Sequence, residues 1–163
     1  MSNYKLILED TFEEDFTLIA IHCSEDCYKV AYLLNQFLQV RLHRSKTDLE
    51  YSEDGLEITF PLYDYEDEMK YTSYNLIANI CKNPIPLTTS SGGLFENEPT
   101  ESSITSYLVP EMKQVDFFIK IVSDFETIPL KKILSSINEI KQVISAYSVD
   151  IQTLKSKNNL IFD

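Results

Sequence analysis

The sequence predicts an α+β fold in which two amphipathic helices cover one face of a largely antiparallel sheet. Two segments have apolar residues at helical spacing, and most other apolar segments have the composition or the alternation of strands. In chain order, two strand–helix–strand units bracket a block of hairpins. A ferredoxin-like core with inserted hairpins is one arrangement that satisfies this order.

The first helix is expected in residues 24–38. Ser24 is the expected N-cap, and Glu25 and Asp26 suit the positive end of the helix dipole. The second helix is expected in residues 127–144, where Pro129 fits the first turn. Apolar side chains recur at helical spacing in both segments, at Cys27, Val30, Ala31, Leu34, Phe37 and Leu38, and at Leu130, Ile133, Leu134, Ile137 and Ile140.

Strands account for most of the remaining apolar segments. Asp54-Gly55 predicts a turn, and the alternation after it continues through Pro61, which indicates an edge strand or a bulge. The next apolar segment, after a turn at residues 65–68, completes a hairpin. The predicted strands span residues 16–23, 40–44, 51–65, 69–80, 103–109, 115–122 and 143–150.

The 163 residues are expected to form a single domain over 1–163, with a long loop at about 84–103. That loop contains three of the six prolines and two of the three glycines, and it is either a surface loop or a lid over a site.

Asp and Glu outnumber Lys and Arg by 26 to 14, so a nucleic acid or an anionic membrane surface is an unfavourable partner. No signal peptide or spanning segment is evident, and three cysteines without a disulfide pattern predict a cytoplasmic protein.

The stretch from Val109 to Phe117, VPEMKQVDF, offers the most specific pattern. Pro110 sets the backbone for a turn, and Asp116 at the start of a strand is expected to accept hydrogen bonds from N–H groups of the loop that starts at Pro110. In the alternative interpretation Glu111 and Asp116 are an acid/base pair, which requires them to converge in a cleft.

The same stretch resembles the signature of a bacterial family, known from Bacteroidetes, that is named for its IPExxxVDY motif. The ending LKSKNNLIF is similar to that family as well. Because the family has no assigned activity, the resemblance implies no catalytic residues. The chain departs from the motif at Val109 and Phe117, and a phenylalanine in place of the tyrosine predicts that position 117 packs in the core.

Other candidate sites are weaker. His22 and Cys23 point to opposite faces of a strand, and the spacing of Cys23 and Cys27 is not that of a zinc site, so neither a metal nor another cofactor is predicted. Cys27 could be a nucleophile only if its pKa were lowered, and the neighbouring acids oppose that. Arg41 and Arg44 are a possible anion contact, although pairing with nearby acidic residues is the more ordinary role.

Two features suggest interaction surface. Tyrosines cluster in the predicted hairpin, at Tyr63, Tyr65, Tyr71 and Tyr74, and the chain ends in an apolar tail that contains Leu160 and Phe162. The leading hypothesis is therefore a non-catalytic module that binds another protein or self-associates. The alternative is an enzyme or a binder of small anionic ligands, with its site under the 84–103 loop and carboxylates from Glu111 and Asp116.

Overall fold

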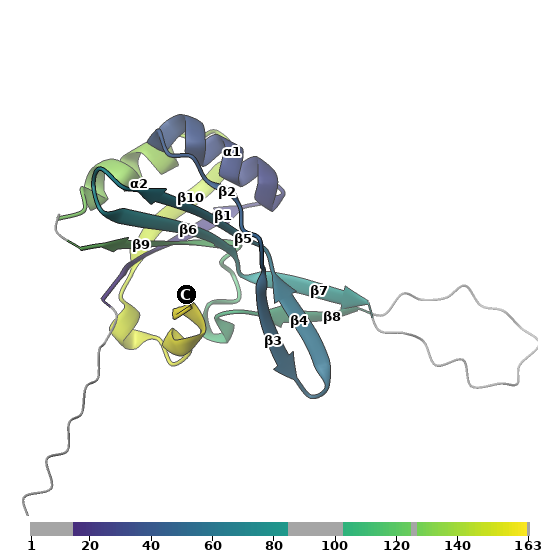
Figure 1. Cartoon of the computed structure of the whole chain (residues 1–163). Coiled ribbons are helices and arrows are strands. Elements are labelled where there is room, and N and C mark those ends of the chain that lie inside the picture. Colours follow the sequence, from purple (N-terminus) through teal and green to yellow (C-terminus); the bar gives the residue numbers. More distant parts are fainter. Residues whose placement is uncertain (1–14, 85–102, 125–126, 163) are drawn as a thin grey trace, which may run out of the picture.

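The computed structural model describes residues 15–84, 103–124 and 127–162, and these form two helices and ten strands (Figure 1). The main sheet has six strands in the order β10-β1-β9-β6-β5-β2, and every neighbouring pair is antiparallel. The strands of this sheet are β1 (Thr17–Cys23), β2 (His43–Arg44), β5 (Leu62–Asp67), β6 (Thr72–Ala78), β9 (Phe117–Ser123) and β10 (Val143–Val149).

The two helices, α1 (Cys27–Leu38) and α2 (Leu130–Asn138), lie on the same face of the main sheet, as the sequence predicts (Figure 1). Helix α1 follows β1, and α2 connects β9 to β10, which flank β1 on its two sides. Together with β6 these elements have the interleaved strand order of a ferredoxin-like core. The remaining strands are inserted between α1 and β6 and between β6 and β9.

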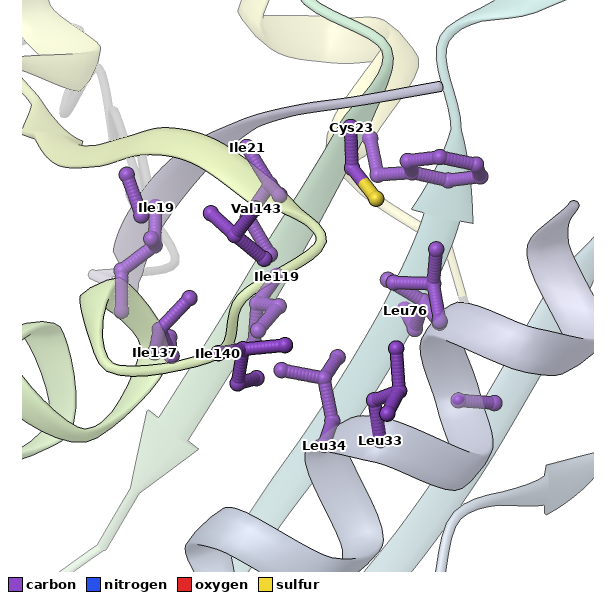
Figure 2. Packing of buried hydrophobic residues seen from close by; sticks show 14 of the residues in the cluster. Ile19, Ile21, Cys23, Leu33, Leu34, Leu76, Ile119, Ile137, Ile140 and Val143 are labelled. Atoms are coloured by element: carbon purple, nitrogen blue, oxygen red, sulfur yellow. The ribbon is translucent and has the colours of Figure 1, made fainter. Parts of the chain in front are cut away.

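Apolar side chains between the helices and the sheet form what we call the helix-side core (Figure 2). Fully buried members come from both layers, among them Leu34 of α1, Ile137 of α2 and Ile119 of β9. Phe117 is only 7% exposed and belongs to this core, as expected for position 117. Two details of α1 differ from expectation: Asp26 is the N-cap in place of Ser24, and Phe37 is 40% exposed.

Two hairpins depart from the main sheet. The first joins β3 (Leu49–Glu53) to β4 (Leu56–Phe60) through Asp54 and Gly55, whose φ angles of 51° and 78° are those of a left-handed turn. The predicted turn is confirmed. The long strand predicted after it is split, because Pro61 separates β4 from β5 of the main sheet. The second hairpin joins β7 (Ile80–Pro84) to β8 (Ser103–Tyr107).

The face of the sheet opposite the helices carries a second core, which we call the opposite core. It is covered by the β3–β4 hairpin and by three short 3-10 segments, η1 (Pro110–Met112), η2 (Ile151–Thr153) and η3 (Lys157–Leu160). The sequence did not predict this layer. Its buried members are Phe16, Leu18, Ala20, Leu49, Ile58, Phe60, Leu62, Ile77, Leu108, Val109, Val115, Phe118, Ile151 and Leu160.

Candidate functional site

Asn79 holds the loop that contains the motif. This residue is fully buried at the corner where β6 ends and β7 begins. Its side-chain Nδ2 donates to the carbonyls of Met112 (2.9 Å) and Val115 (2.8 Å), and its Oδ1 accepts from the N–H of Val109 (2.9 Å). Its own carbonyl accepts from Leu108, and its N–H donates to the carbonyl of Asp116. One buried amide thus satisfies several backbone groups of residues 108–116.

Asp116 fastens a different segment from the one expected. Its Oδ2 accepts a hydrogen bond of 2.9 Å from the N–H of Cys23, at the end of β1, and its own N–H donates to the carbonyl of Ile21. The expectation that Asp116 fastens the loop starting at Pro110 is therefore wrong. Cys23 is distant in the sequence and becomes a neighbour because β1 pairs with β9. Asn79 performs the role that was assigned to Asp116.

Glu111 binds a third segment. Its carboxylate accepts from the backbone N–H of Ser156 (2.8 Å) and from the Ser156 hydroxyl. Partial burial by itself would raise the pKa of the Glu111 carboxyl, but these hydrogen bonds outweigh it and lower the pKa below its ordinary value. Glu111 and Asp116 are thus engaged with opposite ends of the chain and are not arranged as a pair.

The C-terminal segment is anchored to the same region. The Tyr51 hydroxyl donates to the carbonyl of Asn159 (2.6 Å), and the Asn159 side chain donates to the carbonyl of Leu108 (2.8 Å). Leu160 is fully buried in the opposite core, so in this fold it offers no surface to a partner. The Phe162 ring packs against that core, and the ammonium group of Lys120 lies 4.5 Å from its centroid.

Beside these anchors lies an open groove between the two hairpins. It consists of two adjoining hollows of about 420 Å³ and 260 Å³. We call it the hairpin groove; the two hollows share the residues Glu53, Ile58, Ser106, Tyr107 and Pro110. Figure 1 shows the β3–β4 and β7–β8 hairpins leaving the same side of the main sheet in different directions. The motif residue Pro110 therefore lies in the wall of a surface depression.

Of the two arginines considered as a possible anion contact, Arg44 is already paired with a carboxylate. The Arg44 guanidinium binds the Asp48 carboxylate through Nε and Nη2, at distances of 2.6 to 3.1 Å, and lies 5.6 Å from the centroid of the Tyr63 ring. Arg41 is exposed. Next to them, His43 lies 2.9 Å from Asp64. This arrangement balances charge within the chain and leaves Arg44 with a carboxylate already bound.

The tyrosines of the β5–β6 hairpin are mostly packed. Tyr63, Tyr65 and Tyr74 lie half-buried against the helix-side core, and the rings of Tyr65 and Tyr74 stack at 6.0 Å. Tyr71, in contrast, is 62% exposed at the hairpin turn. Two further exposed tyrosines were missed by sequence reasoning: Tyr28 and Tyr32 lie one turn apart on α1, outside its apolar stripe.

The cysteines are thiols held in or near the cores. Burial raises the pKa of the Cys27 thiol to about 12, and burial also raises that of Cys23. A thiol with so high a pKa is a poor nucleophile. Among the described residues, no group of three or more His, Cys, Asp or Glu side chains could hold a metal ion.

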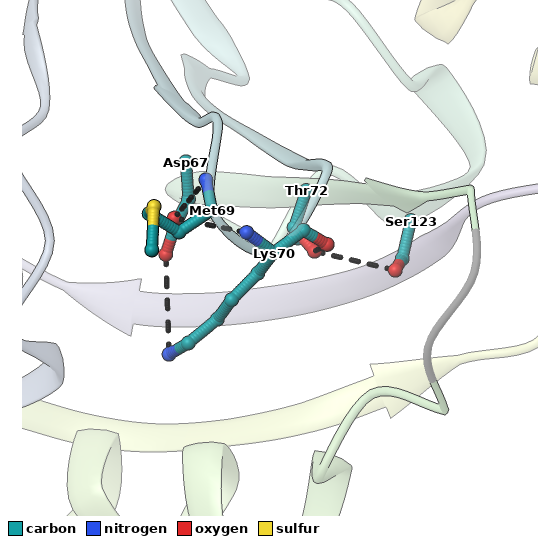
Figure 3. Close-up of polar contacts among 5 residues, drawn as sticks. All are labelled: Asp67, Met69, Lys70, Thr72 and Ser123. Atoms are coloured by element: carbon teal, nitrogen blue, oxygen red, sulfur yellow. Dashed lines mark hydrogen bonds and ion pairs between the residues drawn. The ribbon is translucent and has the colours of Figure 1, made fainter.

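A further hollow of about 440 Å³ lies at the turn between β5 and β6. Figure 3 shows how the turn is built: the Asp67 carboxylate accepts from the N–H groups of Met69 (3.1 Å) and Lys70 (3.2 Å). The Thr72 hydroxyl donates to the carbonyl of Lys70 (3.0 Å) and contacts Ser123 on β9 (3.2 Å). These contacts are those of an ordinary Asp-stabilised turn, so they explain the turn without a ligand.

Comparison of the chain with protein-family models, curated proteins and solved structures finds no match. The resemblance to the IPExxxVDY family stays a prediction. No helix in the described ranges has the length and apolar character needed to cross a membrane. The long loop predicted at about 84–103 lies almost wholly outside the described residues.

Proposed function

We propose that the protein is a non-catalytic protein-interaction module that binds its partner in the hairpin groove. The observation that carries this proposal is the combination of apolar lining and an open strand edge in one depression. Leu56 and Ile58 of one hairpin and Ile104 and Tyr107 of the other line the larger hollow. In the part of the chain that the structure describes, β8 is paired with β7 alone. Open strand edges are templates for pairing with another chain.

The roles of Asn79 and of two motif residues support the same proposal. Asn79, Glu111 and Asp116 each bind backbone groups of other segments, which is how a fixed surface is built and not how acids and bases for catalysis are presented. Asn79 fixes the loop that bears Pro110 and hence one wall of the groove. We further propose that the protein belongs to the IPExxxVDY family, because Pro110, Glu111 and Asp116 match its motif. We also propose a cytoplasmic location, because Cys23, Cys27 and Cys81 are free thiols.

Site-specific photo-crosslinking in the cells that produce the protein tests this function. A photoreactive residue is placed at Thr105, in the groove, and in a parallel variant at Lys132, on the exposed face of α2. We expect a discrete protein adduct from position 105 that position 132 does not give. An adduct with a second copy of the chain would identify self-association. Equal or absent adducts at both positions would contradict a protein-binding role for the groove.

A further inference from the structure

We propose that the hairpin groove binds a basic segment of another protein in extended conformation, as an added strand along β8. This inference rests on the proposed function and names the chemistry of the partner. It depends on three properties of the groove: the way β8 borders it, the apolar lining, and the charge of the β3–β4 hairpin.

The border of the larger hollow indicates an extended occupant. Four consecutive residues of β8, from Ile104 to Tyr107, line it. Successive side chains of a strand point to opposite faces, so one face of β8 would contribute only every second residue. A hollow lined by consecutive residues therefore runs along the edge of the strand. A peptide that lies there can use main-chain hydrogen bonds, the interaction that gives strand addition its affinity.

The lining indicates which residues of the added strand face the groove. Ile58 is buried in the floor, Leu56 and Tyr107 are half-exposed, and Ile104 is 39% exposed. An extended peptide would place every second side chain over this apolar lining. We therefore expect apolar residues at alternate positions of the partner. The intervening positions point away from the floor and are free to carry charge.

The charge of the β3–β4 hairpin selects the sign of those intervening residues. Residues 49–60, which make up this hairpin, contain four Asp and Glu residues and no Lys or Arg. The carboxylates of Glu50, Glu53, Asp54 and Glu57 are exposed, and none of them belongs to an ion pair found among the described residues. Glu53 and Asp54 line the groove itself. Acidic side chains are common on a surface, but here they border an apolar groove and an open strand edge.

The position of Lys113 indicates where in the groove the basic residues of the partner do not lie. The ammonium group of Lys113, which lines the same hollow as Glu53 and Asp54, lies 5.5 Å from the centroid of the Tyr107 ring. Basic residues of the partner are therefore expected over the hairpin, where the potential is negative, and not beside Lys113. A second copy of this chain is a poor occupant, because its net charge of −12 would be repelled by the same hairpin.

Selection from a displayed library of short random peptides tests the inference on the full-length protein. Sequencing of the bound peptides, followed by amide hydrogen exchange of the protein with a selected peptide, reports both composition and place of binding. We expect enrichment of Lys or Arg alternating with apolar residues, and slowed exchange at residues 104–107. Binding should weaken as the salt concentration rises.

Comparison of two variants isolates the role of charge at the groove. The triple change Glu53→Gln, Asp54→Asn and Glu57→Gln should weaken a selected peptide by about tenfold, the order expected for losing several exposed ion pairs. Asparagine accepts the left-handed conformation at position 54, so the turn is retained. The control, Glu66→Gln with Glu68→Gln, removes acids of the β5–β6 turn. It should change binding by less than about twofold.

Each remaining outcome is decisive. If peptides without basic residues protect β8, or if the triple variant binds as tightly as the control, the inference of a basic partner is overturned while the protein-binding function stands. If no selected peptide protects β8, the inference of an added strand is overturned, and crosslinking at position 105 decides the protein-binding function separately.

Discussion

The two faces of the main sheet are covered in different ways, and the difference explains what the sequence reveals. On the helix side, Asn35 and Asn138 bind backbone groups only 7 and 8 residues away. On the opposite side, Glu111 and Tyr51 bind groups 45 and 108 residues away. One cover is made of helices with a period that can be read from the sequence, and the other of irregular segments fixed by remote hydrogen bonds.

The largest effect is expected from Asn79→Ala. The change leaves three backbone groups of the motif loop without partners in the interior, and each such group costs about 1–3 kcal/mol. We expect the free energy of unfolding, measured by urea denaturation, to fall by about 4 kcal/mol, since some of these groups will recover water.

Asn138→Ala is the matched control for this change. The Asn138 side chain also makes three hydrogen bonds to backbone groups, but it is exposed at the end of α2. Because water can replace those bonds, we expect a loss of about 1 kcal/mol. Equal losses for Asn79→Ala and Asn138→Ala would show that the buried, remote anchor is no more important than the exposed, local one.

The second prediction compares the two cores directly. Leu34 on α1 and Leu160 near the C-terminus are both fully buried, in the helix-side core and in the opposite core respectively. Leu→Ala at either position removes buried volume, and we expect each change to lower the free energy of unfolding by about 3 kcal/mol. Urea denaturation followed by circular dichroism measures both.

The result for Leu160→Ala also tests whether the C-terminal tail is part of the fold or a binding surface. Deletion of residues 158–163 should destabilise the fold, because it removes Leu160 from the opposite core and the carbonyl to which Tyr51 donates. If Leu160→Ala costs less than about 1 kcal/mol while Leu34→Ala costs about 3, the C-terminal segment is not an integral layer. In that case the tail would again be available to a partner.

The helices and the turn of the β3–β4 hairpin are predictable because their signals are local. Period 3.6 in residues 27–38 and the Asp54-Gly55 turn each depend on neighbours within a few residues. The α+β class follows from the succession of such elements, but the strand order of the main sheet does not. Pro61 was recognised as an irregularity, but the sequence does not show that the strands on either side of it belong to different sheets.

The anchors could not be predicted, because they depend on contacts between distant segments. Asn79 stands inside an apolar run, NLIANI, where a polar residue breaks the pattern of a buried strand, and this was the available signal. Its partners lie 30 to 36 residues away. Glu111 and Asp116 were singled out by the motif, but their partners, Ser156 and Cys23, come from the two ends of the chain.

The smallest effect is expected from Glu111→Gln, and it should depend on pH. Hydrogen bonds from Ser156 lower the pKa of the Glu111 carboxyl in the folded state, so ionised Glu111 stabilises the fold above its ordinary pKa of 4.5. That contribution is lost as the pH falls through the lowered pKa. At neutral pH we expect Glu111→Gln to cost at most about 1 kcal/mol, because the pair is near the surface.

Urea denaturation of both proteins at neutral pH and at progressively lower pH measures the effect. The difference between wild type and Glu111→Gln should shrink toward zero in acid, since protonated Glu111 and glutamine are then both neutral. Glu139→Gln removes an exposed carboxylate that has no side-chain hydrogen bond among the described residues, so it corrects for the loss of one charge. A difference that persists unchanged in acid would mean that the carboxylate charge does not hold Ser156. The C-terminal segment would then be retained by Leu160 and Tyr51, which makes the opposite core a product of packing more than of polar anchors.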